Sequence, residues 1–279
     1  MLEHAEVLKN ILVSAIASKH PSRPSEVTDE QFKSCRSFLS NFIGNDRGNK
    51  RIGKVFSVNY DLLLYWSILH DSFDVDWDTG EMVVEADQEL THDDGFRADE
   101  DDYDAEYVAW DAFQGTNTQS IFFLHGALHL YERGPQLAKM CWERAGNSPL
   151  MDQIRSALDQ DRYPLFVSEG STGFKMKRIN RSAYLSRSLR SFSGCCTTKG
   201  AALFIVGHSL ATNDDHVLKR IKKGKIGRLF VSLFGDPDSP GNKEIRARAE
   251  ALAEGRRPVD AMTVNFIDAA SIHVWDAAA

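Results

Sequence analysis

Six short apolar runs constrain the fold of this chain more than any other feature of its sequence. Within each run, apolar side chains follow one another without alternating, and a polar residue or a glycine closes the run. Such runs are typical of parallel strands that are buried on both faces of a sheet. The six runs are KVFSVNYD (54–61), SIFFLHG (120–126), PLFVSEG (164–170), ALFIVGHS (202–209), RLFVSLFG (228–235) and TVNFIDA (263–269).

Segments with helical spacing separate several of these runs, so strands and helices alternate along the chain. This alternation predicts an α/β fold, with an open, mainly parallel Rossmann-like sheet and helices on both faces. We expect it to occupy residues 51–279, after a helical N-terminal segment over residues 1–50. In that segment Thr28 and Gln31 resemble a capping box at a helix start. The expected helices span 2–19, 28–42, 60–70, 180–192, 213–223 and 242–255, and residues 130–164 are expected to form loop and short helix.

Acidic residues are concentrated in one window of the chain. From Asp71 to Asp111 there are 17 acidic residues and a single basic one, Arg97. The window interrupts the alternation between the first and second strands. We therefore interpret residues 71–115 as an acidic insertion, with a hairpin around Trp77–Val84 and a loop at Asp93–Arg97.

Basic residues are concentrated later in the chain. The stretch Lys175–Arg228 holds 13 basic residues and two acidic ones. It could contact a phosphate-bearing ligand or nucleic acid, face the acidic window, or simply be solvated. Few aromatic residues interleave with the stretch, which disfavours the stacking that binds single-stranded nucleic acid.

Composition narrows the class of protein. The chain has 279 residues, of which 42% are hydrophobic and 26% charged, so it can bury a sizeable core and does not resemble a disordered protein. It has no run of 18 apolar residues and no signal-peptide core, and we expect a cytoplasmic protein without a membrane partner. The four cysteines include no C-x-x-C pair, so we expect no metal site.

Polar residues follow three of the predicted strands at the point where each strand ends. In a doubly wound sheet ligands bind beyond the carboxyl ends of the strands, and parallel strands bring those ends to one rim. Glycines at the rim allow a ligand to approach the backbone closely. We therefore expect one pocket to contain these groups. The residues are Asn59 and Asp61 after the first strand, His125 and Gly126 after the second, and Gly207, Ser209 and Asp214 after the fourth.

Each of these groups also has an ordinary structural explanation. Asn59 and Asp61 are residue types that cap the start of a helix. His125 is equally typical of a hydrogen-bonded structural histidine, and Gly207 with Ser209 of a turn. A further carboxylate, Glu169, follows the third strand, where a structural ion pair with a basic neighbour is the ordinary alternative.

Taken in chain order, three motifs resemble the signatures of the sirtuin-like NAD-binding fold. They are Asn59-Tyr60-Asp61, His125-Gly126 and Gly207-His208-Ser209. The closer resemblance is to uncharacterised bacterial sirtuin-like proteins of unknown function, and it covers roughly residues 50–235. That closer resemblance rests on Phe166–Gly170, Tyr184-Leu185 and Gly207–His216.

The resemblance implies an enzyme that hydrolyses NAD at the nicotinamide–ribose bond, in the setting of bacterial antiphage defence. In this family pattern Asn59 orients a water or the ribose, Asp61 holds the nicotinamide carboxamide and His125 is the general base. The ligand is then NAD, a small-molecule nucleotide, and a homo-oligomer is compatible with the pattern. The residues implied to bind the nucleotide are Gly126, Gly207, Ser209, Asp214 and Glu169.

The sequence departs from the sirtuin pattern in two respects. No strand with a Gly-rich, phosphate-cradling loop precedes Lys54, and the four-cysteine zinc module is absent. The missing zinc module disfavours a function as a protein deacetylase, but it does not bear against a function as an NAD glycohydrolase. The missing loop leaves three alternatives: a start upstream of Met1, phosphates held by other groups, or a protein that does not bind a dinucleotide. It also favours a competing function, a module of the same fold that senses a nucleotide without turnover. A nucleic-acid or protein interaction domain that uses residues 175–228 is a further alternative.

Overall fold

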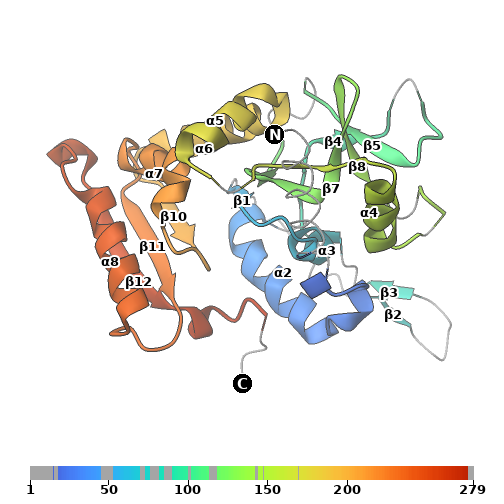
Figure 1. The fold of residues 1–279 in the computed structure, drawn as a ribbon. Helices are drawn as coiled ribbons and strands as arrows, with labels where there is room; N and C mark the ends of the chain where they lie inside the picture. Colours follow the sequence, from blue (N-terminus) through green and yellow to red (C-terminus); the bar gives the residue numbers. More distant parts are fainter. Residues whose placement is uncertain are drawn as a thin grey trace. The chain divides into compact units, whose positions relative to one another are not determined.

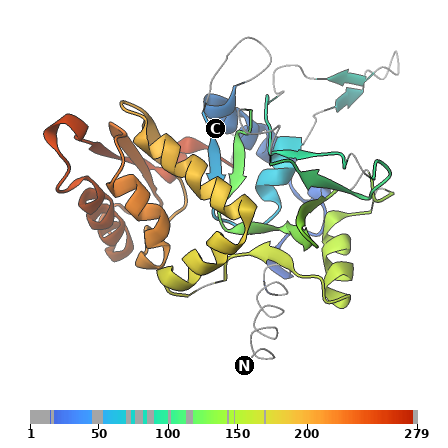
Figure 2. The ribbon, with the colours of Figure 1, turned by 90° about the horizontal axis from the view of Figure 1, so that it is seen from above.

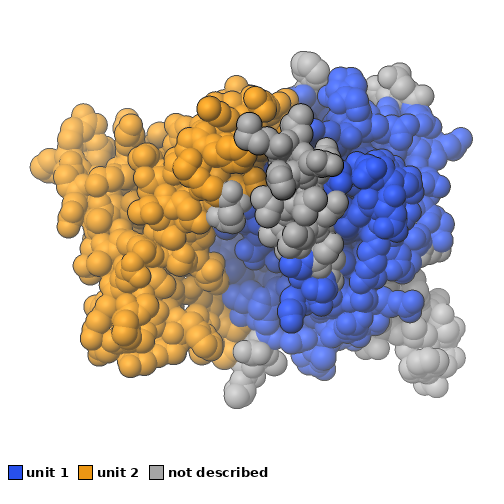
Figure 3. All heavy atoms as spheres, in the orientation of Figure 1, with its two compact units in different colours: residues 1–166, 274–279 blue, residues 167–273 orange. Residues whose placement is uncertain are grey.

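The computed structural model divides the chain into two compact units. Unit 1 comprises residues 1–166 with 274–279, and unit 2 comprises residues 167–273 (Figure 3). The division falls inside the segment 51–279 that the sequence predicts to be one α/β domain. The structure describes residues 15, 18–44, 53–69, 73–75, 82–84, 90–99, 102–112, 118–141, 144–146, 148–168 and 170–275 (Figures 1 and 2).

Unit 2 contains a parallel three-stranded sheet with the strand order β10-β11-β12. Helix α7 connects β10 to β11, and α8 connects β11 to β12, so the unit is built from two successive strand–helix–strand crossovers. Helix α8 packs on β11 and β12, as Figure 1 shows. The parallel strands predicted here are confirmed. Their bounds are β10 (Ala202–Ile205), β11 (Arg228–Leu233) and β12 (Thr263–Asp268), and those of the helices are α5 (Thr172–Arg181), α6 (Ala183–Thr197), α7 (Asp215–Lys222) and α8 (Pro240–Ala253).

Serine side chains mark three helix starts in unit 2. Ser171, Ser182 and Ser239 each accept a hydrogen bond from the backbone N–H three residues later, which satisfies one of the unpaired donors at a helix N-terminus. Leu229 and Val231 on the central strand are fully buried. Local capping and a buried apolar central strand therefore explain why these segments form helices and a sheet.

Unit 1 begins with the helix that the capping box predicts. Helix α2 (Asp29–Ile43) starts after Thr28, whose side chain accepts from Gln31 N while the Gln31 side chain accepts from Thr28 N. It packs against α3 (Leu63–Leu69). The helix predicted over residues 2–19 lies mostly outside the described residues.

Besides a short antiparallel hairpin described below, the described part of unit 1 contains two sheets. Strands β1 and β6 form a parallel pair, and five further strands form an antiparallel sheet in the order β4-β5-β8-β7-β9, with helix α4 in contact with β7. A buried core draws side chains from the helices and this sheet, including Phe32, Trp66, Leu128 and Met151. The bounds are β1 (Val55–Ser57), β4 (Phe96–Arg97), β5 (Tyr107–Trp110), β6 (Ile121–Phe123), β7 (Gly126–Arg133), β8 (Gln136–Met140), α4 (Leu150–Asp159) and β9 (Pro164–Phe166).

The prediction of one mainly parallel sheet is wrong for the described residues. The run at Pro164–Phe166 is a strand, but it pairs antiparallel with β7. Residues 130–164, expected to be loop and short helix, contain the second half of β7, all of β8 and helix α4. The cause is that an apolar run indicates burial but carries no information about the direction of its neighbour. At the coarser level the α/β fold with parallel strands is confirmed.

The acidic window contains a predicted hairpin and an unpredicted strand pair. Strands β2 (Phe73–Val75) and β3 (Met82–Val84) pair antiparallel, which confirms a hairpin in this region. The predicted loop at Asp93–Arg97 contains β4, which pairs with β5. Among the described helices, none combines the length and apolar character that crossing a membrane requires.

Candidate functional site

Asn59 and His125 lie at the same end of the parallel β1–β6 pair in unit 1. The register pairs Ser57 with Phe123, and each polar residue follows its strand by two positions. Leu124 N donates to Ser57 O at 2.8 Å, which extends the pairing toward the carboxyl ends of the strands. Both residues therefore follow the carboxyl end of the same strand pair in unit 1.

His125 sits in the tight turn between β6 and β7 and is buried. The Tyr60 ring stacks beside its imidazole, with 6.3 Å between centroids and 27° between the ring planes. Asn59 is exposed in the loop after β1, and its backbone N–H donates to Ser57 Oγ at 3.1 Å. The rim thus combines a buried imidazole with an exposed carboxamide.

Asp61 caps helix α3. Its Oδ1 accepts from Leu63 N at 3.0 Å, the bond expected of an aspartate that precedes a helix. The sequence leaves two explanations open for Asp61, a ligand contact or a helix cap, and the structure shows the cap. An N-terminal cap places one carboxylate oxygen against the backbone, so this side chain serves α3 directly.

Gly126 is required by packing. Its φ is +82°, and a Cβ atom at this position would lie 1.9 Å from Leu165 O on the neighbouring strand β9. The expectation that Gly126 makes room for a ligand is therefore corrected, because the close approach is made by the chain's own backbone. The missing side chain lets β7 and β9 meet beside His125.

In unit 2, the residues after β10 form a loop that three hydrogen bonds hold in place. Gly207 has φ +68° and donates its N–H to Ser232 Oγ at 3.1 Å. Leu210 has φ +54°, an uncommon conformation for a bulky residue, and donates its N–H to His208 Nδ1 at 2.9 Å. Arg248 donates to Ser209 O at 3.0 Å. Gly207 and Ser209 are exposed, while Leu210 is buried. The loop therefore exposes two small residues, and its backbone is held by the hydrogen bonds given above.

Asp214 joins this loop through a buried ion pair. Its Oδ1 lies 2.9 Å from Lys175 Nζ, and its Oδ2 lies 3.3 Å from His208 Nε2. The Lys175 side chain is fully buried on α5. Burial lowers the pKa of neighbouring His216, although the Asp214 carboxylate acts in the opposite direction.

Sequence reasoning missed the roles of Lys175 and His208. Lys175 lies four residues before Ile179, and these two form the buried stripe of α5. Helix residues four apart share a face. The four-residue spacing between Lys175 and the apolar Ile179 was therefore a signal in the sequence that Lys175 is buried. Glu169, predicted to lie on the rim, is outside the described residues.

The predicted site residues thus fall into two groups. Asn59 and His125 follow the two parallel strands of unit 1, while Gly207, Ser209 and Asp214 lie in the loop region of unit 2. A family model described as "Domain of unknown function (DUF4917)" matches residues 1–275. The chain belongs to this family. The DUF4917 match includes both groups of residues. No curated protein matches the chain.

Proposed function

We propose that the protein binds NAD and hydrolyses the bond between nicotinamide and ribose. The observation that supports the proposal is the β1–β6 register, because Asn59 and His125 each follow by two positions the last paired residues, Ser57 and Phe123, of two parallel strands. The order of the three motifs along the chain agrees with the sirtuin-like pattern. NAD depletion in antiphage defence is the setting that this resemblance suggests.

The chemistry assigned to the unit 1 rim requires a base and an orienting group. Cleavage of the nicotinamide–ribose bond develops positive charge on the ribose, and a water attacks its anomeric carbon. His125 would accept the proton from that water or from a ribose hydroxyl, a contribution that is typically about 10²–10⁴-fold in rate. The Asn59 carboxamide, which is exposed, would orient the water or the ribose. Asp61 is left with its capping role.

Unit 2 is assigned binding and no chemistry. The parallel β10-β11-β12 sheet with crossover helices is an arrangement used by Rossmann-like nucleotide-binding proteins. In the loop after β10, Ser209 is exposed, and Arg248 holds its backbone by a hydrogen bond to Ser209 O. A preformed loop reduces the entropy lost on binding. Ser209→Ala is therefore expected to weaken NAD affinity more than it slows the chemical step.

A nucleotide-sensing module without turnover is the second candidate. It is favoured by two findings, because Asp61 caps a helix and Gly126 packs against Leu165 O. Both residues are thereby removed from the set that the sirtuin-like pattern places on the nucleotide. Binding of NAD without release of nicotinamide would identify this function.

The experiment incubates the full chain with NAD and follows nicotinamide release by chromatography, with NAD affinity measured by calorimetry. Asn59→Ala is the informative variant because its side chain is exposed, and Asn41→Ala on α2 is the matched control. We expect turnover in the wild type, a loss of at least about tenfold in Asn59→Ala and His125→Gln, and no change in Asn41→Ala. Absence of both binding and release would overturn the proposal.

A further inference from the structure

A cavity in unit 1 lies at the opposite end of the β1–β6 pair from Asn59 and His125. Its volume is about 700 Å³, and its walls include Lys54 directly before β1 and Ser120 directly before β6. Because the two strands are parallel, residues that precede both of them share the amino end of the pair. A cavity of this volume holds a small organic molecule. It is therefore separate from the rim assigned to NAD chemistry.

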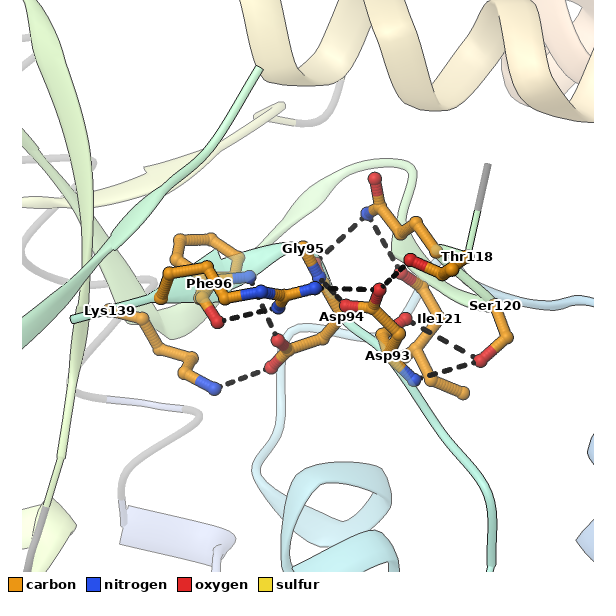
Figure 4. Close-up of polar contacts among 10 residues, drawn as sticks. Asp93, Asp94, Gly95, Phe96, Thr118, Ser120, Ile121 and Lys139 are labelled. Atoms are coloured by element: carbon orange, nitrogen blue, oxygen red, sulfur yellow. Dashed lines mark hydrogen bonds and ion pairs between the residues drawn. The ribbon is translucent and has the colours of Figure 1, made fainter. Parts of the chain in front are cut away.

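One wall of the cavity is built around Asp93. Its backbone N–H donates to Ser120 Oγ at 3.0 Å, and its carbonyl accepts from Ser120 N at 2.7 Å and Ile121 N at 3.0 Å. Its carboxylate accepts from Gly95 N at 2.7 Å, from Arg97 at 2.8 Å and from the Thr118 hydroxyl. Figure 4 shows this cluster joining the Asp93 segment to the Thr118–Ile121 segment. The wall is thus rigid before any ligand arrives.

The carboxylates in the wall are already neutralised by the protein. Burial alone would raise the pKa of the Asp93 carboxyl, but the hydrogen bonds from Arg97, Thr118 and Gly95 lower it below its usual value. The neighbouring Asp94 carboxylate forms an ion pair with Lys139 Nζ and accepts from Phe96 N at 3.1 Å (Figure 4). Asp93 and Asp94 therefore hold the basic side chains of Arg97 and Lys139 in place.

The lining carries an excess of positive charge. Among the described residues that line the cavity, three are basic and two are acidic, which gives these residues together a formal charge of +1. Arg97 is the cation best placed to meet a ligand, because its side chain is 45% exposed. Its hydrogen bonds within the described residues use two of its five N–H groups, to Asp93 and to Phe96 O. The basic residues are Lys54, Arg97 and Lys139, and the acidic residues are Asp93 and Asp94.

We propose that this cavity is a second ligand site, which binds a small molecule bearing one acidic group through Arg97 and Lys54. Arginine forms strong charge-assisted hydrogen bonds to carboxylate and to phosphate, so the shared chemistry is an anionic oxygen group. The hydroxyls of Thr118 and Ser120 border the same cavity and can bond to the remainder of the ligand. The single net positive charge of the described lining residues matches a ligand with a single negative group.

The test titrates inorganic phosphate, and separately acetate, into the full chain and measures affinity by NMR of each probe. Arg97→Gln is compared with Arg155→Gln, because Arg155 is also an ion-paired arginine in unit 1, with 47% of its side chain exposed, and lies on α4 away from the cavity lining. We expect saturable binding that is about tenfold weaker in Arg97→Gln and unchanged in Arg155→Gln. Lys54→Gln provides a second variant should Arg97→Gln fail to fold.

Each outcome has a defined meaning. Binding of phosphate alone identifies a phosphate ester as the ligand class, and binding of acetate alone identifies a carboxylate; both support the site. Binding of neither probe, or equal weakening in Arg97→Gln and Arg155→Gln, overturns the proposed ligand site. Arg97 would then have only a structural role, through its ion pair with Asp93. Arg97→Gln is expected to keep the wild-type rate of nicotinamide release, so failure of this site and failure of the NAD proposal are distinguishable.

Discussion

Lys175 Nζ lies 2.9 Å from Asp214 Oδ1, and the Lys175 side chain has no exposure to solvent. The two residues are 39 positions apart and connect helix α5 to the segment that leads into α7. A charge removed from water in this way is tolerated only when a partner compensates it. The pair therefore holds together the part of unit 2 that presents Gly207 and Ser209.

Replacing Lys175 by methionine should destabilise unit 2. The variant keeps the length of the side chain but leaves the Asp214 carboxylate without its principal partner, and breaking a buried pair typically costs about 3–5 kcal/mol. Chemical denaturation of the variant measures the free energy of unfolding. The double variant with Asp214→Asn should recover part of the loss, and a double variant no more stable than Lys175→Met would contradict an ion pair.

Protein stability should fall as the pH falls below about 6.5, because of His129. This imidazole is fully buried against Tyr65 and Phe123, and neither ring nitrogen has a hydrogen-bond partner among the described residues. Burial, and then the charge of Lys139, place its pKa well below the usual value. In the unfolded chain the same group takes up a proton near pH 6.5, so acid favours unfolding by up to about 1.4 kcal/mol per pH unit.

The measurement is urea denaturation between pH 7.5 and 5. His129→Leu should flatten the pH dependence in this window by about one proton, since the substituted side chain does not titrate. His216, whose pKa is also lowered by burial, contributes in the same direction and remains in the variant. An unchanged slope in His129→Leu would contradict a neutral, buried imidazole.

Gly126→Ala should be far more destabilising than Gly134→Ala. Both glycines have positive φ, +82° and +59°, so both substitutions carry the backbone cost of about 1 kcal/mol for alanine in this region. At Gly126 the added Cβ also meets Leu165 O at 1.9 Å, whereas at Gly134 nothing lies within 4 Å. Thermal unfolding of the two variants provides the comparison, and equal losses would show that the β7–β9 contact is not this close.

Alkylation should distinguish the four cysteines. Burial is the main cause that raises the pKa of Cys196 to about 12, and burial also raises the pKa of Cys35. The thiolate is the reactive form, so these two should resist iodoacetamide at pH 8, while the half-buried Cys141 and Cys195 react first. Peptide mass spectrometry over time measures the order, and early labelling of Cys196 would contradict its burial.

Local sequence signals predicted the elements of the fold. The apolar runs at β1, β6, β10, β11 and β12 became parallel strands, and Thr28 with Gln31 formed the capping box of α2. These signals succeed because capping and burial of a short segment depend on neighbours in the chain. They also placed Asn59 and His125 shortly after two strands, and the structure pairs those two strands.

Pairing between distant segments could not be predicted in the same way. The run at Pro164–Phe166 has the composition of a parallel strand, yet it pairs antiparallel with β7 because hydrogen bonding between strands is decided by which edges meet. The segment Asp93–Arg97 reads as an acidic loop, but its polar groups bond to Thr118 and Ser120 and form a cavity wall. Charge counts along the chain do not show which acids will be neutralised by which bases.

The amino-acid sequence by itself thus determined several of the strands and helices and which polar residues end those strands, since hydrophobic burial and helix capping act over a few residues. Tertiary structure alone decided the antiparallel sheet of unit 1, the buried Lys175–Asp214 pair and the cationic cavity beside Arg97. Each of these depends on contacts between segments far apart in the chain, whose free energy is gained only when the whole unit has folded.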